Sequence, residues 1–529
     1  MPRLVVLGWD SATFEVVDPM LEAGRLPALA GLRENGFRAP LRSTWPPMTD
    51  CAWTSAFTGC NPGTHGIFGS WYRAPGKYEC RYFSSRDRRA PVLWELADDV
   101  RFAVWNVPMA FPPTAIDGVM VSGYGAPPGS RFCAPDSIQD ELAGRWPAAD
   151  LADRAPHSTL EAFLDDLIRG LEVQAEALVW LAGRSDADCV VAVWPHVDRA
   201  QHFFWRFRGT QHHLADAVER VYEAMDRATG TLIDAFDDAD FLVVSDHGAG
   251  TLKADVNVGA WLASQGFATY GRKRSSRLVD LAWRMPPAVR RMGKRFWPGA
   301  ARRAFGATLA GQLGSFDWEE TAAFVGFQGD LWLNLAGREP AGNVLADAAE
   351  EVLSEIASGL LALEDPSSGE PLFAAAHRRE DIYSGAAIDL APDLMLDSWS
   401  AGYRVSPGRE AAEGIVIPPA PLAGVDAAWS SDHRPLGIFV AGGPRIAAGS
   451  ATELSLYDVC PTALALLDRA VPRRLDGSVA EDAIDPGFLA SHPVREGTDA
   501  VHHPGGDGEY SEAEAAAVAA HLKDLGYIE

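Results

Sequence analysis

Short runs of apolar residues, rich in β-branched side chains, recur along the first half of the chain. Runs of about four to eight such residues, bounded by turn-forming residues, are typical of strands that are buried on both faces. They occupy residues 4–8, 102–107, 119–124, 189–195 and 241–248. We therefore predict a buried strand at each of these positions.

Segments with a helical period separate these strands. The clearest runs from Ser158 to about Gly183, where the sequence "STLE" forms a capping box and apolar residues fall on one face. A second helix is predicted over residues 213–236. Strands that alternate with helices favour an α/β fold, here a three-layer α/β/α sandwich around a central, mostly parallel sheet.

The periodicity is weaker in the second half of the chain. Strands are predicted at 330–335 and 437–443, and a helix at about 343–363. The final "YSEAEAAAVAAHLKDLGYIE" has the pattern of a capped amphipathic helix. Together these patterns predict one large domain over residues 1–490 and a C-terminal tail and helix over 491–529.

A basic helical insert is predicted within this domain at residues 266–315. Its central part, 272–303, holds many arginines and lysines against a single acid, Asp280, with tryptophan, phenylalanine and methionine between them. One interpretation is a helical hairpin whose aromatic side packs on the core and whose arginines pair with the acidic body, and we favour it. The other is peripheral contact with a membrane surface or lipid, or the steering of an anionic substrate.

The composition narrows the range of partners and compartments. The 529 residues are 47% hydrophobic and carry a formal net charge of -26, which disfavours binding of a nucleic acid polymer over the whole surface. The six cysteines show no paired spacing, so no disulfide framework is expected. The sequence opens without a leader-like segment and holds no apolar run long enough to span a membrane. We therefore expect a cytoplasmic protein, and its oligomeric state stays open.

The segment "WPPMTDCAWTSAFTGCNPGTHGIFG", residues 45–69, concentrates hydroxyl side chains in one short stretch. Pro46 and Pro47 end any preceding element, and Gly59 follows the expected end of a helix. Thr49 therefore lies at a helix N-terminus, where free backbone N–H groups and the helix dipole favour an anion such as a phosphate ester. A threonine hydroxyl becomes an effective nucleophile when a base or a metal ion lowers its pKa.

Candidate metal ligands lie at the ends of predicted strands, where open α/β sheets place their sites. They are Asp10, Asp198, His202, Asp246, His247 and His433. With one hydroxyl, these carboxylates and imidazoles suffice for two divalent ions and suit zinc or manganese. Each residue alone has a simpler explanation, such as a turn, a cap or an i, i+4 pair on a helix surface. His65 is expected to be a buried, backbone-bonded histidine rather than a ligand.

Several of these motifs occur together in the order typical of one family. Asp10, "PPMT", "PGTHGI", "DRAQH", "SDHG" and "DHRPLGIFVAGGP" resemble successive motifs of the alkaline phosphatase superfamily, in its type I phosphodiesterase and nucleotide pyrophosphatase branch. The resemblance continues through "GREP", "APDL" and "LYDVCPTALALLDRAVPRRLDG", and so covers the chain to about Gly477. It implies an alkaline-phosphatase-like fold that holds two divalent metal ions, zinc foremost and manganese as the alternative.

The resemblance also implies a role for each site residue. One ion would be held by Asp198, His202 and His433, and the other by Asp10, Asp246 and His247. Thr49 would be the nucleophile and an oxygen ligand shared by both ions. Twenty-one residues after the nucleophile, the family often has an asparagine that donates to a phosphate oxygen, and Ser70 stands there. Ser70 is therefore predicted to bind the substrate.

The predicted activity is hydrolysis of small-molecule phosphate esters, foremost phosphodiesters or nucleotide pyrophosphates, through a phosphothreonine on Thr49. Transfer of a phosphoryl or phosphoalcohol group to an alcohol is an alternative, in which the basic insert holds a lipid anion. Hydrolysis of monoesters or phosphonates also stays open. A catalytically silent protein that binds metal and nucleotide is disfavoured, because it has no need of the nucleophile. Residues 125–185, predicted to form a helical rim, and the insert are expected to select the substrate.

Overall fold

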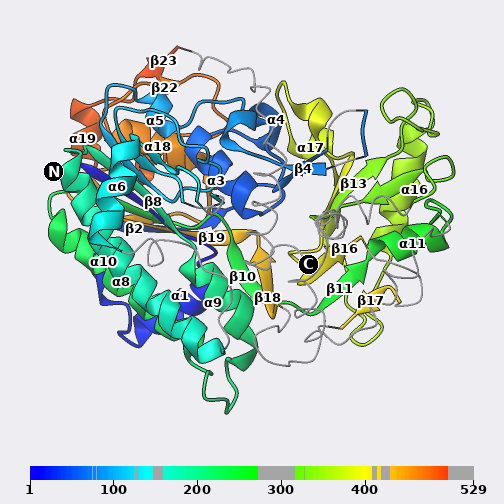
Figure 1. The fold of residues 1–529 in the computed structure, drawn as a ribbon, viewed down its shortest axis with the longest axis horizontal. Helices are drawn as coiled ribbons and strands as arrows, with labels where there is room; N and C mark the ends of the chain where they lie inside the picture. Colours follow the sequence, from blue (N-terminus) through cyan, green and yellow to red (C-terminus); the bar gives the residue numbers. More distant parts are fainter. Residues whose placement is uncertain are drawn as a thin grey trace.

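The computed structural model shows a larger and a smaller lobe, side by side (Figure 1). The described residues are 1–73, 76–78, 80–123, 125–126, 129–146, 159–271, 316–326, 328–407, 414–418 and 429–498. The basic residues 272–303 and the predicted C-terminal helix lie outside the described residues.

A ten-stranded sheet runs through the larger lobe and confirms the predicted α/β class. Its strand order is β20-β2-β19-β9-β1-β8-β5-β6-β7, and β21 also pairs with β2. The central strands from β9 to β6 are parallel, whereas β19 and β7 run antiparallel to their neighbours. The bounds are β1 (Leu4–Trp9), β2 (Phe37–Arg42), β5 (Phe102–Trp105), β6 (Gly118–Val121), β7 (Cys133–Ala134), β8 (Cys189–Trp194), β9 (Asp240–Val244), β19 (Leu436–Gly442), β20 (Gly449–Ser450) and β21 (Leu454–Ser455).

Helices cover both faces of this sheet, as the predicted three-layer sandwich requires (Figure 1). Successive side chains of a strand point to opposite faces, so Val5 and Leu7 of β1 enter one apolar core and Leu4 and Val6 enter the other. The first core is closed by α1 (Phe14–Glu22), α2 (Pro27–Glu34), α8 (Leu160–Arg184), α9 (His196–Phe204) and α10 (Ala217–Ala235). The second is closed by α3 (Thr49–Thr58), α5 (Leu93–Leu96) and α18 (Val459–Leu466).

The smaller lobe has two sheets and its own apolar core. One sheet has the order β12-β13-β15-β14 and the other β16-β11-β17. A buried ion pair between Arg73 and Glu339 ties β3 (Trp71–Arg73) to this lobe, and the Arg73 guanidinium lies over the Trp332 ring. The bounds are β11 (Ala254–Asn257), α11 (Val258–Ser264), β12 (Ala323–Val325), β13 (Asp330–Leu333), α16 (Ala349–Leu361), β14 (Ala375–Arg378), β15 (Leu394–Asp397), β16 (Tyr403–Ser406) and β17 (Val416–Ile417).

Three of the predicted helices form within the described residues, and two of them begin later than predicted, since the one predicted over 213–236 is α10 and starts at Ala217. The helix predicted over 158–183 is α8, and the Thr159 hydroxyl caps it by accepting a hydrogen bond from Ala162 N. The helix predicted from residue 343 begins at Ala349 instead. Asn343 and Val344 donate their backbone N–H groups to Asn334 O, at 2.9 and 3.0 Å, so this stretch is extended pairing and not helix.

All six cysteines are unpaired, as predicted. Burial raises the pKa of the Cys51 and Cys460 thiols well above the usual value, which disfavours the reactive thiolate. None of the helices in the described part of the chain combines the length and the apolar content needed to cross a membrane.

Gly8 occupies a point in β1 where the fold leaves no room for a side chain. A Cβ there would lie 2.4 Å from Trp53 Cη2 and 2.9 Å from Val193 Cγ2. We expect Gly8→Ala to lower the free energy of unfolding by about 1–3 kcal/mol, because both neighbours are fully buried and must shift. Chemical denaturation followed by circular dichroism measures this loss.

The matched control is Gly31→Ala in α2. No atom lies within 4 Å of the added Cβ there, and alanine stabilises a helix by up to ~1 kcal/mol relative to glycine. Equal denaturation midpoints for the two variants would contradict the tight contact between β1 and Trp53.

Candidate active site

Thr49 is the first residue of helix α3, as the sequence predicted. The preceding Met48 has an extended backbone and makes no side-chain cap, and Gly59 ends the helix in the left-handed region at φ 68°. The Thr49 hydroxyl is therefore not used to cap its own helix. It is 3% exposed, and its oxygen lies 3.5 Å from His247 Nε2.

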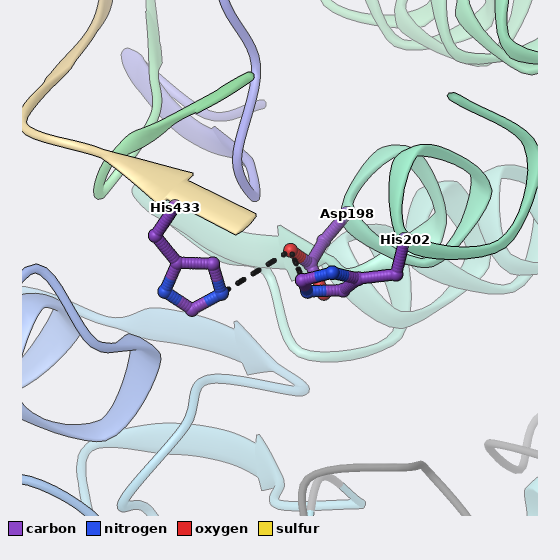
Figure 2. A group of neighbouring side chains, drawn as sticks. All are labelled: Asp198, His202 and His433. Carbon is purple, nitrogen blue, oxygen red and sulfur yellow. Dashed lines mark ion pairs between the residues drawn. The ribbon is translucent and has the colours of Figure 1, made fainter. Parts of the chain in front are cut away.

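Asp198, His202 and His433 form a first cluster of candidate ligands (Figure 2). Asp198 and His202 lie one turn apart on α9, and His433 comes from β18 (Ser431–Arg434). Asp198 Oδ1 is 3.1 Å from His202 Nε2 and 3.8 Å from His433 Nε2. All three side chains are buried, so the i, i+4 pair faces the interior and not the surface of the helix.

Asp10, Asp246 and His247 form a second cluster. Asp10 follows β1, and Asp246 and His247 follow the neighbouring parallel strand β9. Because the carboxyl ends of parallel strands meet at one edge of a sheet, these residues come together as predicted. His247 Nε2 is 3.2 Å from Asp246 Oδ2 and 4.0 Å from Asp10 Oδ1, and all three side chains are fully buried.

The two clusters and the N-terminus of α3 form one site. The rings of His247 and His433 stack, with centroids 3.7 Å apart and planes at 18°. They meet because β18 pairs with β10 (Gly248–Thr251), the strand that directly follows His247. His433 Nδ1 lies 2.8 Å from Pro47 O, two residues before Thr49.

Hydrogen bonds hold the carboxylate and imidazole atoms of the candidate ligands that face away from the centre of the site. Asp10 Oδ2 accepts a hydrogen bond from Trp53 Nε1 at 2.9 Å, and Asp246 Oδ1 accepts one from Ser11 N at 3.1 Å. The three histidines each place Nδ1 against a backbone carbonyl oxygen, those of Ser431, Gly248 and Pro47. With the proton held on Nδ1, each Nε2 presents its lone pair to the interior.

Several inner atoms of the clusters point at no hydrogen-bond donor. Asp10 Oδ1, Asp246 Oδ2 and His433 Nε2 are buried and have no hydrogen-bond partner among the described residues. Buried polar atoms are almost always satisfied, so their grouping marks a site for something that they bind. Carboxylate oxygens and imidazole nitrogens together fit divalent metal ions of the zinc and manganese type.

Burial and mutual repulsion dominate the electrostatics of the clusters. Burial raises the pKa of Asp10 and of Asp246 well above the usual value, and the charge of Asp198 adds to both shifts. Burial also acts on Asp198, but His202 and His433 outweigh it and lower the pKa of that carboxyl.

The same burial keeps two of the imidazoles neutral. It is the main cause of the low pKa of His247 and of His433, and each of these values lies below the usual range. Metal ligands must be deprotonated, so His247 and His433 are in the form that binds a cation. Burial acts on His202 as well, but Asp198 outweighs it and raises the pKa of that imidazole.

Ser70 lies where the smaller lobe meets the segment that follows α3. Its backbone N donates to Gln328 Oε1 at 3.2 Å, and Gln328 Nε2 donates to Ser70 Oγ at 3.3 Å. Burial raises the pKa of Asp50 to about 6, and a hydrogen bond with Ser70 opposes that rise. Sequence reasoning missed Gln328, which lies 258 residues from Ser70 and outside any motif.

His65 is a structural histidine, as expected. Its Nε2 lies 2.8 Å from Ser55 Oγ, and its Nδ1 accepts a hydrogen bond from Ile67 N at 3.1 Å. It belongs to neither ligand cluster. Burial, aided by the charge of Arg88, lowers the pKa of His65 to about 3.

Most of the chain matches one known protein family. The family model described as type I phosphodiesterase / nucleotide pyrophosphatase matches residues 4–414. His433 lies beyond that match, and the strand pairing described above brings it to the site. A search of curated proteins finds no match to the sequence.

Two solved structures share the fold at low sequence identity. An inactive variant of murine ectonucleotide pyrophosphatase / phosphodiesterase 5 in complex with AMP superposes with a TM-score of 0.52 at 11% identity, covering 92% of this chain and 100% of that chain. Phosphonoacetate hydrolase from Sinorhizobium meliloti 1021, in complex with phosphonoacetate, superposes with a TM-score of 0.50 at 16% identity, covering 87% and 94%.

The His65 environment predicts a pH dependence of stability. The unfolded chain takes up a proton near pH 6.5, whereas folded His65 does so only near pH 3, so acid favours the unfolded state. Stability from this residue is complete above pH 6.5 and is lost, by up to ~1.4 kcal/mol per pH unit, as the pH falls from 6.5 towards 3.

We expect His65→Gln to unfold more easily than the parent at pH 7.5 but to lose less stability between pH 6.5 and 5. The measurement is denaturation with urea in chelator at several pH values. Ser55→Ala, which removes one hydrogen bond and keeps the imidazole, is expected to retain the steep dependence. Identical slopes for the parent and His65→Gln would refute the assignment.

Proposed function

Because the chain belongs to the type I phosphodiesterase / nucleotide pyrophosphatase family, a family of hydrolases that use two divalent metal ions, we propose that it hydrolyses phosphodiester or nucleotide pyrophosphate bonds through a phosphothreonine on Thr49. The observation that supports this most is the position of the Thr49 hydroxyl. It is buried at a helix N-terminus, 3.5 Å from one candidate ligand and two residues from the carbonyl that bonds another.

The two clusters are proposed to hold one ion each. Asp198, His202 and His433 would hold the first, and Asp10, Asp246 and His247 the second, with zinc as the metal. Such ions supply Lewis-acid stabilisation of the charge on the attacking and leaving oxygens.

The residues of α3 bind and attack the phosphoryl group. The backbone N–H groups of its first turn have no acceptor within the helix, so together with the helix dipole they favour a phosphate oxygen beside Thr49. Thr49 Oγ1 forms a bond to phosphorus while the bond to the leaving oxygen breaks, and the hydroxyl proton passes through solvent to that leaving oxygen. Water then cleaves the phosphothreonine, which releases phosphate or its monoester and restores the hydroxyl.

Ser70 is proposed to donate to a phosphoryl oxygen. Gln328 Nε2 donates to Ser70 Oγ, and the Ser70 hydroxyl bonds the carboxylate of Asp50, so a phosphoryl oxygen would compete with that carboxylate for the proton. The shorter reach of serine relative to asparagine makes this contact the feature that distinguishes the substrate range of this chain.

The first test is the rate of hydrolysis by purified protein that is stripped with chelator and reloaded with zinc or manganese. We expect bis(p-nitrophenyl) phosphate to be cleaved faster than p-nitrophenyl phosphate. Thr49→Ala should reduce the rate by at least ~1,000-fold, because the covalent step is lost. Thr58→Val, which removes another buried hydroxyl of α3, should keep most of the activity.

Different outcomes lead to different conclusions. A monoester rate above the diester rate would replace the diesterase assignment with a monoesterase one. Full activity in Thr49→Ala would overturn the phosphothreonine. Two bound ions without turnover of either ester would favour a transferase or a silent binding protein over a hydrolase.

Each cluster is also expected to lose its ion independently. His433→Ala and Asp10→Ala should each lower the zinc content of reloaded protein from about two ions per chain to about one, because three-ligand sites fail when one ligand is removed. Inductively coupled plasma mass spectrometry after desalting measures the content. His65→Gln should retain both ions, and loss of zinc from that variant would argue against the assignment of the ligands.

A further inference from the structure

The loop that carries Asp10 is held in an unusual backbone conformation. Ser11 has φ 65°, in the left-handed region that residues other than glycine rarely adopt. That conformation costs roughly 1–2 kcal/mol, so tertiary contacts must hold it. It allows Ser11 N to donate to Asp246 Oδ1 at 3.1 Å, and the Ser11 hydroxyl to approach Gly248 O at 3.4 Å. Ser11 thus links Asp10 to the strand end that bears Asp246 and His247.

The contacts that hold this loop come from the helix of the other cluster. Gln201 lies on α9 between Asp198 and His202 and is fully buried. Its Nε2 donates to Ser11 O at 2.9 Å and to Ser11 Oγ at 3.2 Å. Its Oε1 accepts a hydrogen bond from the Tyr222 hydroxyl at 3.1 Å. Both polar atoms of the amide are therefore used.

Tyr222 completes a clamp around the loop. Its hydroxyl oxygen accepts a hydrogen bond from Thr13 N at 3.1 Å, so the two ends of the loop, Ser11 and Thr13, are bound to one pair of side chains. Tyr222 comes from α10, fully buried against Trp9 of β1. The clamp crosses from α9 and α10 to the end of β1, and each of its groups is paired.

We propose that Gln201 is a positioning residue that fixes the second ligand cluster relative to the first. This rests on the proposed function, in which each cluster holds one ion. The ligands of the first cluster have their own supports, the carbonyls of Ser431 and Pro47 behind His202 and His433. In the second cluster, Asp246 is held by Ser11 N, and the backbone of Asp10, whose carboxylate is also held by Trp53 Nε1, leads directly into the same loop. Loss of the Gln201 amide therefore weakens the ion of the second cluster selectively.

The test measures each site alone, in single-site backgrounds. In His433→Ala protein the remaining ion reports the second cluster, and in Asp10→Ala protein it reports the first. Adding Gln201→Met, which keeps the length of the side chain and removes both hydrogen-bonding atoms, should weaken the ion by about 10–100-fold in the first background and leave it unchanged in the second. Calorimetric titration of chelator-stripped protein with Co²⁺ gives both affinities without any assay of turnover.

Two further variants separate positioning from general stability. Tyr222→Phe keeps the amide but removes one of its partners, so a smaller loss is expected at the second cluster. Gln174→Leu is the matched control, since Gln174 is a buried glutamine on α8 whose Oε1 accepts from Trp105 Nε1, a residue of neither cluster. It should lower the melting temperature without changing either affinity.

The outcomes are distinguishable. Equal weakening in both backgrounds, or no weakening in either, would overturn the role of Gln201. If the parent protein takes up no ions, the proposed two-ion function itself fails before Gln201 is tested. Selective loss at the second cluster supports the clamp even if no ester is turned over.

Discussion

Three carboxylates and three imidazoles are buried together at the carboxyl edge of one parallel sheet, and the surrounding structure is organised by the free-energy cost of that burial. A buried carboxylate without compensation costs several kcal/mol. The raised pKa values of Asp10 and Asp246 express this cost directly. One oxygen of each acid accepts a hydrogen bond, Asp10 from Trp53 and Asp246 from Ser11. The other oxygen of each acid is buried without a hydrogen-bond partner among the described residues and faces the centre of the site. A cation bound at the centre, as proposed, would stabilise the whole arrangement.

The same constraint explains how the hydroxyls of α3 are paired. Everything on α3 is buried, so its polar side chains must find partners within the protein. Thr54 and Thr58 donate to backbone carbonyls one turn earlier, and Ser55 bonds His65. Thr49, at the first position, instead directs its oxygen towards His247. Position on the helix therefore separates the proposed nucleophile from hydroxyls that serve packing.

The sequence predicted the parts of the site that follow local rules. Apolar runs located the central strands, and acids at their ends met because parallel strands share an edge. Helical spacing placed Asp198 and His202 on one face. His433 was attached to them by resemblance alone, since its arrival depends on the pairing of β18 with β10, which no local pattern encodes.

The hydrogen bonds that support the site residues from outside the clusters were not predicted, for a related reason. Gln201 stands inside a quoted motif, yet its partner Ser11 lies 190 residues away, and Gln328 reaches Ser70 across 258 residues. A glutamine that bonds a distant backbone carries no spacing signal. The start of α16 was misplaced because Asn343 and Val344 satisfy their backbone by pairing with Asn334, a tertiary choice that overrides the helical period.

The proposed metal ligands and the proposed substrate contact come from different parts of the chain. Helix α9 packs Val197, Ala200 and Phe204 into the core of the larger lobe while its polar side holds the first cluster and, through Gln201, the loop of the second. The packing of α9 against the sheet therefore determines the geometry of the proposed metal centre. Ser70, by contrast, is held by an amide from the smaller lobe. Because that lobe has a separate core, changes in its loops are expected to alter the proposed contact of Ser70 with substrate without disturbing the ligands.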